Sequence, residues 1–269
     1  MLELQEVSVG YARDPVLRGL HLILPDGGLT ALIGPNGCGK STLLRTACGL
    51  LEPSAGRVLL DGAALQEVPR KERARRIAFL PQSRPVPDLT ARSLVLHGRF
   101  PYLGYPRRYG KADYAAADAA LAAVGAQALA GRDLRSLSGG ERQKVYIAMA
   151  LAQDAPTILL DEPTTYLDID RQFEVMHLLS ALRAQGKTVV AVLHDLALAF
   201  RFADRVVLLQ DGAVCADGAP DEVAASGALA RAFHVAARRI EVPEFGVQYV
   251  FAPIGASDLS DRPAPDPGK

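Results

Sequence analysis

The chain offers no net charge to a partner. Its 30 Lys and Arg residues are matched by 30 Asp and Glu residues, so the formal charge is zero and the isoelectric point is about 7.0. Proteins held to nucleic acid by bulk charge carry a basic excess. The balance therefore argues against nucleic acid as a partner.

Long apolar segments and cysteines are also missing or scarce. No uninterrupted apolar run is long enough to cross a bilayer, and the opening residues 1–4 lack the basic and apolar regions of a signal peptide. The three cysteines, Cys38, Cys48 and Cys215, show no metal-ligand spacing. We therefore expect a soluble, cytosolic chain with free thiols. Cys38 is interpreted either as a small filler residue or as a point of sensitivity to alkylation.

Against these absences stands one glycine-rich stretch, Gly34-Pro35-Asn36-Gly37-Cys38-Gly39-Lys40-Ser41. It reads G-x-x-x-x-G-K-S, the pattern of a phosphate-binding loop. An apolar run of strand type, residues 29–33, precedes it. The residues after it recur at helical spacing, namely Leu43, Leu44, Ala47 and Leu50. The loop therefore has the strand and the helix that the pattern requires on either side.

The residue types of this loop explain how it would bind phosphate. Glycines let the backbone turn tightly and point its N–H groups inward, and the following helix adds its positive end. Lys40 supplies a charge for the β- and γ-phosphates, and Ser41 supplies a hydroxyl for Mg²⁺. We predict that the loop and the adjoining Thr42 bind a nucleoside triphosphate. Asn36 is the only asparagine in the chain, which argues against the N-K-x-D element of the common GTPases.

Outside the loop, apolar runs alternate with helical patterns. Strands are predicted at residues 77–80, 157–160, 188–193 and 205–209, and this alternation indicates a mostly parallel sheet covered on both faces. The N-terminal part predicts a strand over residues 2–9, Tyr11 in a turn and a second strand at Gly19–Leu24. The charge run Arg70–Arg76 predicts a solvated helical face, and a place near anionic lipid stays open.

The sequence pattern changes between residue 85 and about residue 154, where alanine-rich helical segments such as 112–124 replace the strand-like runs. We interpret this segment as a helical lobe inserted into the core. Within it the aromatic stretch Phe100–Pro106 either caps a helix or forms a surface for a partner. The predicted division is one domain over 1–251, with core 1–84 and 155–251 and lobe 85–154, followed by a disordered tail over 252–269.

Polar residues follow the predicted strands at their carboxyl ends, where ligands gather in open parallel sheets. Asp161 comes directly after an apolar run and is predicted to hold Mg²⁺ with Ser41 and Gln82. Glu162 is the candidate general base. Gln82 would bridge metal and attacking water, and His194 would donate a hydrogen bond to the γ-phosphate. Glu162, His194 and Gln82 are thus the predicted catalytic residues.

A second helix start suited to phosphate is Ser138-Gly139-Gly140. Ser138 is a good N-cap for a helix over about 141–152, and the glycines leave backbone N–H groups open. Taken alone, this is an ordinary helix start. One nucleotide needs only one cradle, so the second would serve a nucleotide held by another copy of the chain.

Together these motifs resemble those of the ABC-type ATPases, in the order typical of that family and over residues 2–251. The phosphate loop resembles the Walker A motif, Ile158–Pro163 the Walker B motif and Leu137–Glu141 the signature motif. Gln82, Asp168 and His194 match its Q-loop, D-loop and H-loop. Tyr11 stands where an aromatic side chain stacks on adenine in that family. Glu141 departs from the glutamine that many members carry.

The resemblance implies a P-loop α/β fold with a mixed, mostly parallel sheet, an N-terminal antiparallel β part and an inserted helical lobe. It implies an ATPase that uses ATP and Mg²⁺. In that family two subunits pair head to tail, so Ser138, Gly139 and Gly140 would contact the γ-phosphate held by the partner's loop. Asp168 would link the two sites across the interface.

Further segments resemble one subgroup. Leu94–Gly104 is similar to the G-R-x-P segment of importers for ferric siderophores, haem and cobalamin, and Pro163–Ile169 and Val190–Leu196 are similar to the ferric citrate and siderophore importers. This implies an ATP-hydrolysing subunit, peripheral on the cytoplasmic face of the inner membrane. It would energise uptake of an iron chelate or cobalamin through a membrane permease, served indirectly by a solute-binding protein.

Two alternatives remain open. One is an importer ATPase for zinc, manganese or another nutrient. The other is a soluble ABC-type ATPase acting on DNA or ribosomes, against which the lack of long coiled-coil insertions, of a second cassette and of a basic stripe argues.

Overall fold

The computed structural model describes residues 1–11, 14–165 and 167–255. Its strands are β1 (Leu2–Tyr11), β2 (Asp14–Leu24), β3 (Leu29–Ile33), β4 (Ala55–Leu60), β5 (Ala63–Ala64), β6 (Ile77–Leu80), β7 (Thr157–Leu160), β8 (Thr188–Val192), β9 (Arg205–Gln210), β10 (Ala213–Gly218), β11 (Val235–Val242) and β12 (Gly246–Pro253). Its helices are α1 (Lys40–Ala47), α2 (Arg70–Arg76), α3 (Ala91–Leu96), α4 (Lys111–Ala123), α5 (Gly139–Ala152), α6 (Ile169–Ala184), α7 (Leu196–Phe202), α8 (Pro220–Ala225) and α9 (Ala228–Phe233), with 3-10 turns η1 (His97–Tyr102), η2 (Gln127–Leu129) and η3 (Leu134–Ser136).

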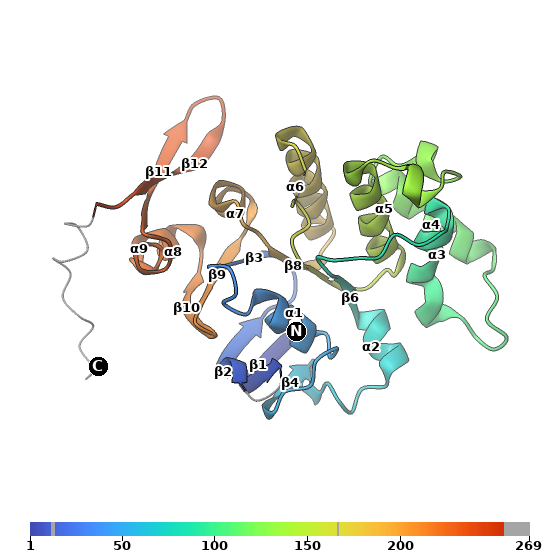
Figure 1. The fold of residues 1–269 in the computed structure, drawn as a ribbon, viewed down its shortest axis with the longest axis horizontal. Helices are drawn as coiled ribbons and strands as arrows, with labels where there is room; N and C mark the ends of the chain where they lie inside the picture. The colour runs from blue at the N-terminus through green and yellow to red at the C-terminus, as the bar shows by residue number, and fades with distance from the viewer. Residues whose placement is uncertain (12–13, 166, 256–269) are drawn as a thin grey trace.

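A six-stranded sheet in the order β10-β9-β3-β8-β7-β6 forms the centre of the molecule (Figure 1). The pairs β9-β3, β3-β8, β8-β7 and β7-β6 are parallel, and β10 pairs with β9 antiparallel. Every residue of β3, β7 and β8 is buried. Strands buried on both faces are rich in apolar residues. Strands β3, β6 and β7 span 29–33, 77–80 and 157–160, which confirms the predicted bounds.

A second, antiparallel sheet packs beside the phosphate loop in the order β2-β1-β4-β5. The apolar side chains of β1 and β2 share one core with those of α1. The structure corrects two predictions here. Tyr11 is the last residue of β1 rather than part of a turn, because it pairs with Asp14, and β2 begins at Asp14 instead of Gly19.

Helix α1 is shorter than the periodicity predicts. It ends at Ala47, and Gly49 follows with a φ of 72°, the left-handed conformation that terminates helices. Leu50 therefore lies beyond the helix, and 69% of its surface is exposed. This large exposed apolar side chain contributes nothing to the core that the helical spacing suggests.

Between β6 and β7 the chain is helical, as predicted for the inserted lobe. Helices α3, α4 and α5 pack against one another and lie to one side of α6 and the central sheet (Figure 1). Helix α2, the predicted charged face, has no buried residue. It is tied to the lobe because Lys71 Nζ donates to the Leu103 carbonyl oxygen at 2.8 Å and Arg75 Nε to that of Pro101 at 3.0 Å.

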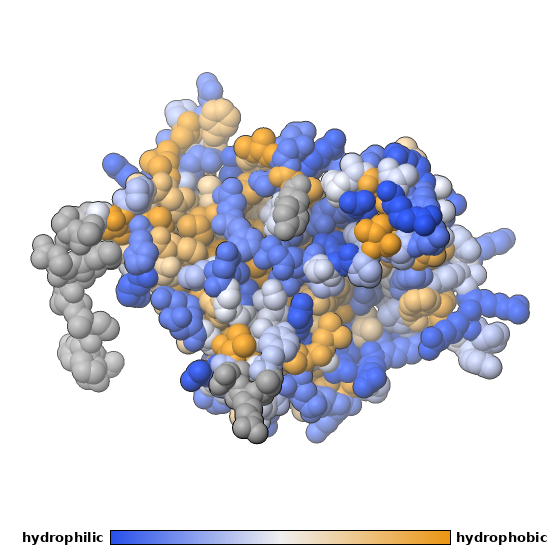
Figure 2. Space-filling view, viewed as in Figure 1, coloured by the Kyte–Doolittle hydropathy of each residue, from blue (hydrophilic) through white to orange (hydrophobic). Residues whose placement is uncertain are grey.

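The C-terminal part adds elements that the sequence does not predict. Strands β11 and β12 form a hairpin whose Tyr249 and Phe251 pack edge-on against Phe200 of α7. Figure 2 shows apolar surface gathered over this hairpin. The strand reaches Pro253, so the prediction of a tail from residue 252 is wrong at its start. The rest of the predicted tail, residues 256–269, lies outside the described residues.

Across the described ranges, the helices are all too short or too polar to cross a membrane.

Candidate functional site

The phosphate loop connects β3 to α1 and has a backbone that only glycine permits at its start. Gly34 has a φ of 153°, and a Cβ there would press on the carbonyl oxygen of Leu209 in the neighbouring strand β9. Gly39 has a φ of 109° and is the N-cap of α1. The sequence thus folds into a tight turn whose end is the first turn of a helix, which is the geometry of an anion cradle.

Lys40 lies inside this turn with only 6% of its surface exposed. Its Nζ donates to the carbonyl oxygens of Gly34 and Pro35, at 2.7 and 2.8 Å. These two neutral acceptors hold the ammonium group in the loop without cancelling its charge. Cys38 Sγ lies 3.8 Å from the same Nζ, and burial raises the pKa of its thiol although the lysine charge opposes the shift.

Asp161 emerges from β7 directly beside the loop, as predicted. It is fully buried, and its Oδ1 accepts a hydrogen bond of 3.0 Å from Ser41 Oγ. Its Oδ2 is buried and has no hydrogen-bond partner among the described residues. Burial raises the pKa of this carboxyl, and the charge of Glu162 adds to the rise.

An orphaned carboxylate oxygen beside a serine hydroxyl fits a hard divalent cation. Oxygen donors are the ligands that Mg²⁺ selects, and a cation would satisfy Oδ2 of Asp161 and favour its ionised form. No group of three or more His, Cys, Asp or Glu residues in the described part of the chain could hold a metal alone. The other ligands of such a cation would therefore include neutral oxygen donors, such as the Gln82 amide, phosphate or water.

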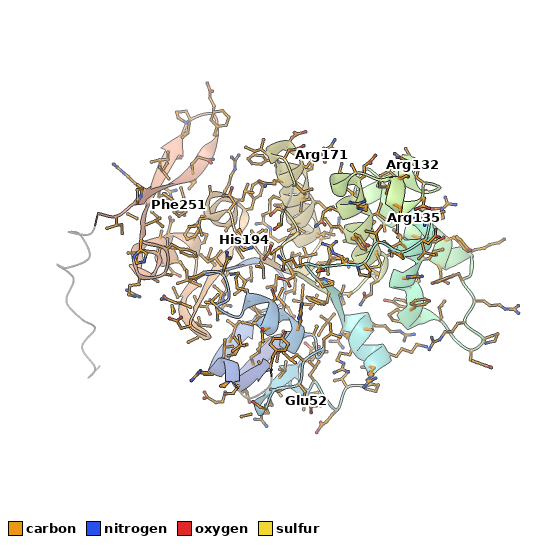
Figure 3. The ribbon with its side chains drawn as sticks, in the orientation of Figure 1. Glu52, Arg132, Arg135, Arg171, His194 and Phe251 are labelled. Atoms are coloured by element: carbon orange, nitrogen blue, oxygen red, sulfur yellow. The ribbon has the colours of Figure 1, made fainter. Side chains whose placement is uncertain are left out.

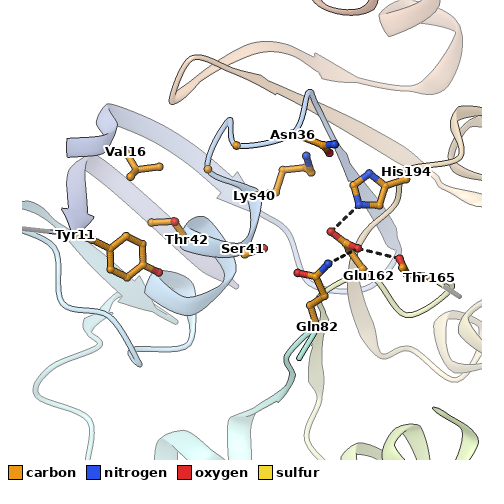
Figure 4. A pocket seen from close by; sticks show the side chains of 12 residues that line it. Tyr11, Val16, Asn36, Lys40, Ser41, Thr42, Gln82, Glu162, Thr165 and His194 are labelled. Carbon is orange, nitrogen blue, oxygen red and sulfur yellow. Dashed lines mark hydrogen bonds and ion pairs between the residues drawn. The ribbon is translucent and has the colours of Figure 1, made fainter. Parts of the chain in front are cut away.

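Glu162 follows Asp161 and is held by donors from three segments. Its Oε1 lies 2.6 Å from His194 Nε2, and its Oε2 accepts hydrogen bonds from Gln82 Nε2 at 2.7 Å and from Thr165 Oγ1 at 2.9 Å (Figure 4). Gln82 follows β6 and His194 follows β8, the two parallel neighbours of β7, so all three strands bring their polar residues to the same edge of the sheet. The predicted convergence of these polar residues is thus what the fold produces.

These residues line one pocket of about 700 Å³. Its walls are Tyr11, Val16, Asn36, Gly37, Gly39, Lys40, Ser41, Thr42, Gln82, Glu162, Thr165 and His194 (Figure 4). The other predicted loop residues, Gly34, Pro35 and Cys38, are not among the residues that line this pocket, and neither is Asp161. Val16 and Thr165 were not predicted as site residues. Val16 is an ordinary apolar residue, and the one sequence feature that could have identified Thr165 is its hydroxyl three residues after Glu162.

The second predicted phosphate site lies elsewhere. Ser138 caps α5, its hydroxyl accepting from the Glu141 amide at 3.3 Å, and Glu141 Oε2 accepts from the Ser138 amide at 2.8 Å. Ser138, Gly140 and Asp168 line a separate pocket of about 470 Å³, while Gly139 faces a neighbouring one. Asp168 is the N-cap of α6, as its side chain accepts from the Arg171 amide.

This second pocket is lined by two acidic and two basic side chains, which come from both lobe and core: Glu141, Lys144, Asp168 and Arg171. Figure 3 shows Arg171 on α6, and Arg132 and Arg135 on the lobe. Arg132 Nη1 lies 3.2 Å from Glu141 Oε1, which helps to lower the pKa of that carboxyl, although the Ser138 amide is the main cause. One chain thus carries two sites suited to phosphate, in two separate pockets.

The first pocket can support hydrolysis of a phosphoanhydride bond. It combines a phosphate cradle, an oxygen site for a divalent cation and a carboxylate held next to an imidazole. Phosphoryl transfer needs positioning and charge stabilisation rather than a covalent partner. The arrangement can supply both, and a carboxylate such as that of Glu162 can accept a proton from water.

Comparison with known proteins agrees with this chemistry. Residues 17–165 match the family model described as ABC transporter. The petrobactin import ATP-binding protein of Bacillus anthracis is 44% identical over 91% of this chain and 90% of its own length. The ferric enterobactin transport ATP-binding protein of Escherichia coli is 43% identical over 93% of each chain.

A solved structure gives the same result for the fold. A dimeric ATP-binding cassette in a post-hydrolysis state with ADP and phosphate matches with a TM-score of 0.74 and 32% identity, over 82% of this chain and 99% of that one. The predicted P-loop fold and ATPase activity are therefore confirmed. The chain belongs to the ATP-binding proteins of the ABC transporter family.

Proposed function

We propose that this ATPase is the peripheral, cytoplasmic motor of an importer for an iron chelate or cobalamin. The relatives named for petrobactin and ferric enterobactin are more than 40% identical over at least nine tenths of the chain, which supports a siderophore as cargo. One observation supports the role of an ATP-driven subunit that works as a pair. The loop of Lys40 and the helix tip of Ser138 line different pockets of one chain, so a single copy cannot use both on one nucleotide.

ATP would bind with its phosphates in the loop. Lys40 would turn from the loop carbonyls to the β- and γ-phosphates, and Tyr11, half exposed at the pocket edge, would stack on adenine. Asp161, Ser41 and Gln82 are the residues that we assign to Mg²⁺, which when bound supplies positive charge against the phosphate oxygens.

Hydrolysis would depend on Glu162. Its carboxylate accepts the proton of the attacking water, as a general base. His194 would leave Glu162 to donate a hydrogen bond to the γ-phosphate, where charge develops. Gln82, which also donates a hydrogen bond to Glu162, would contact both the attacking water and the metal.

Two copies would pair head to tail to complete each site. The N-terminal end of α5 in one copy, at Ser138, would contact the γ-phosphate bound in the loop of the other copy, because the amides at a helix N-terminus favour anions. Gly139 and Gly140 would allow the close approach, and Asp168 would link the two sites. ATP would then favour the closed dimer, and its hydrolysis would favour the open one, through different affinities for the two states.

The permease would contact the pocket formed by the end of α1, helix α2 and strand β6. This pocket of about 530 Å³ has the apolar side chains of Leu50, Ile77 and Phe79 and a basic rim of Arg70 and Arg73. An amphipathic cytoplasmic segment with an acidic residue fits this chemistry. Gln82 follows shortly after the end of β6 and donates a hydrogen bond to Glu162. A displacement of β6 by the permease would therefore also move Glu162.

Transport assays would test the importer and its cargo. The chain, co-expressed with its permease and placed in vesicles, should hydrolyse ATP faster when a loaded solute-binding protein is added. Uptake of ferric siderophore, ferric citrate, haem or cobalamin supports the proposal. Uptake of zinc or manganese alone would select the nutrient alternative. Stimulation by DNA or ribosomes, without any by the binding protein, would replace the transporter with the soluble-factor alternative.

A further inference from the structure

The carboxylate of Glu162 has three donors, and they are not equivalent. Gln82 and His194 come from loops after two other strands, and 42% of the His194 side chain is exposed. Thr165 belongs to the same turn as Glu162, three residues further on. Its amide donates to the Glu162 carbonyl at 3.4 Å, so backbone and side chain tie the two residues together.

The two loop donors have competing partners in the proposed reaction. Gln82 is assigned to metal and water, and His194 to the γ-phosphate. Each would release Glu162 when the triphosphate arrives. The hydroxyl of Thr165 has no such second assignment, and its only side-chain hydrogen bond given by the described residues goes to Glu162 Oε2.

The local geometry suits a fixed donor. Threonine is branched at Cβ, so its χ1 angle is restricted and its hydroxyl position is well defined. Glu162 has a φ of 55°, a left-handed backbone that the surrounding turn must hold in place. Only 10% of the Glu162 side chain is exposed, so water competes little for this bond. A hydroxyl bond to an ionised acceptor is stronger than one between neutral groups.

We propose that Thr165 is a positioning residue, which keeps the Glu162 carboxylate aimed at the attacking water after Gln82 and His194 have turned to metal and phosphate. This role rests on the proposed function of Glu162 as general base. It predicts a loss in the chemical step and none in nucleotide binding, because Thr165 acts only through the carboxylate.

The experiment compares Thr165→Val, which removes the hydroxyl at nearly constant volume, with Thr165→Ser, which keeps it. Both are made in the full chain, alone and with co-expressed permease, and again in a Glu162→Ala background. Thr165→Val should lower kcat about tenfold, since small misplacements of a catalytic group are costly, with the Kd for ATP unchanged. Thr165→Ser should recover most of the loss. In the Glu162→Ala background, Thr165→Val should have no further effect on single-turnover rates.

The controls separate this role from a structural one. Equal melting temperatures for Thr165→Val and wild type exclude a folding defect. Wild-type kcat in Thr165→Val, or the same tenfold loss in the Glu162→Ala background, would overturn the positioning role and leave the proposed ATPase intact. Full wild-type turnover in Glu162→Ala would instead remove the base itself, and the proposed mechanism with it.

Discussion

At the scale of single residues, Glu162 is the general base that we propose for hydrolysis. Glu162→Gln keeps the size of the side chain and one accepting oxygen, but it replaces the other oxygen with an amide NH2 group and removes the basicity. We expect kcat to fall by about 10² to 10⁴, the usual contribution of a general base, with ATP affinity retained. Steady-state phosphate release and a direct nucleotide titration measure the two quantities. A variant that turns over ATP like the wild type would take Glu162 out of its role.

Lys40 should fail in the opposite way. Its ammonium is buried in the loop, where it donates to the Gly34 and Pro35 carbonyl oxygens and contacts Cys38 Sγ, and the described residues give it no ion pair, so it is available for phosphate. Lys40→Ala should weaken ATP binding by about 10-fold or more, because a charge-assisted hydrogen bond contributes about 1.5–3 kcal/mol. Isothermal titration with a non-hydrolysable ATP analogue measures this loss. An unchanged affinity for the ATP analogue would contradict the proposed role of this loop in binding phosphate.

The cysteines provide a chemical test of the same loop. The thiolate is the reactive form, and burial raises the pKa of Cys38 and raises that of Cys48 to about 11. Both thiols therefore stay protonated to a higher pH than an unperturbed cysteine, and their alkylation should speed up as the pH rises. Cys215 is exposed. Peptide mapping after brief iodoacetamide treatment at pH 7.5 should find Cys215 labelled first, and early labelling of Cys38 would contradict the buried loop.

At the scale of elements, the end of α1 and the start of β6 are where a partner would act. Leu50 is exposed, lies in the pocket assigned to the permease and belongs to no core cluster. Leu50→Glu should place a charge on the apolar floor at little cost to folding. We expect co-purification with the permease to fall at least several-fold, while the ATPase rate of the isolated subunit stays unchanged.

The control for this surface is an exposed residue far from the pocket. Phe245, in the turn between β11 and β12, is 63% exposed, and Phe245→Glu introduces the same charge there. It should leave permease binding at the wild-type level. If Leu50→Glu binds the permease equally well, the docking surface lies elsewhere, for example at the exposed aromatic segment around Tyr105.

The elements also show why some parts of the fold can be predicted and others cannot. Strands β3, β6 and β7 are mostly buried and consist almost entirely of apolar residues, so their bounds can be predicted from the sequence. The hairpin β11-β12 is only half buried and has no such run, and its strands are fixed by packing on Phe200. Leu50 fits the helical period, yet Gly49 ends the helix before it.

The same distinction applies to the candidate site. Lys40, Asp161 and His194 could be found because each lies next to a recognisable motif or at the end of an apolar strand. Thr165 could not, since its importance arises from a contact of 2.9 Å that depends on the left-handed backbone of Glu162. Sequence patterns predict which strand ends converge, but the orientation of a side chain within a turn follows from the folded backbone.

At the scale of the whole molecule, the proposed pairing of two copies predicts a dimer that depends on ATP. The loop pocket and the Ser138 pocket are separate within one chain, and the cassette with ADP and phosphate to which the chain is similar is dimeric. Blocking hydrolysis should therefore accumulate the closed, ATP-bound pair. Lys40→Ala is the matched control, because it should bind ATP poorly and should therefore not dimerise.

The most direct test is the mass of the Glu162→Gln variant in solution, measured by light scattering with and without Mg²⁺ and ATP. The account predicts the mass of two chains with ATP and Mg²⁺, of one chain without them, and of one chain for Lys40→Ala under both conditions. Glu162→Gln that binds ATP and Mg²⁺ yet keeps the mass of one chain, and does not pair when its permease is added, would contradict the account.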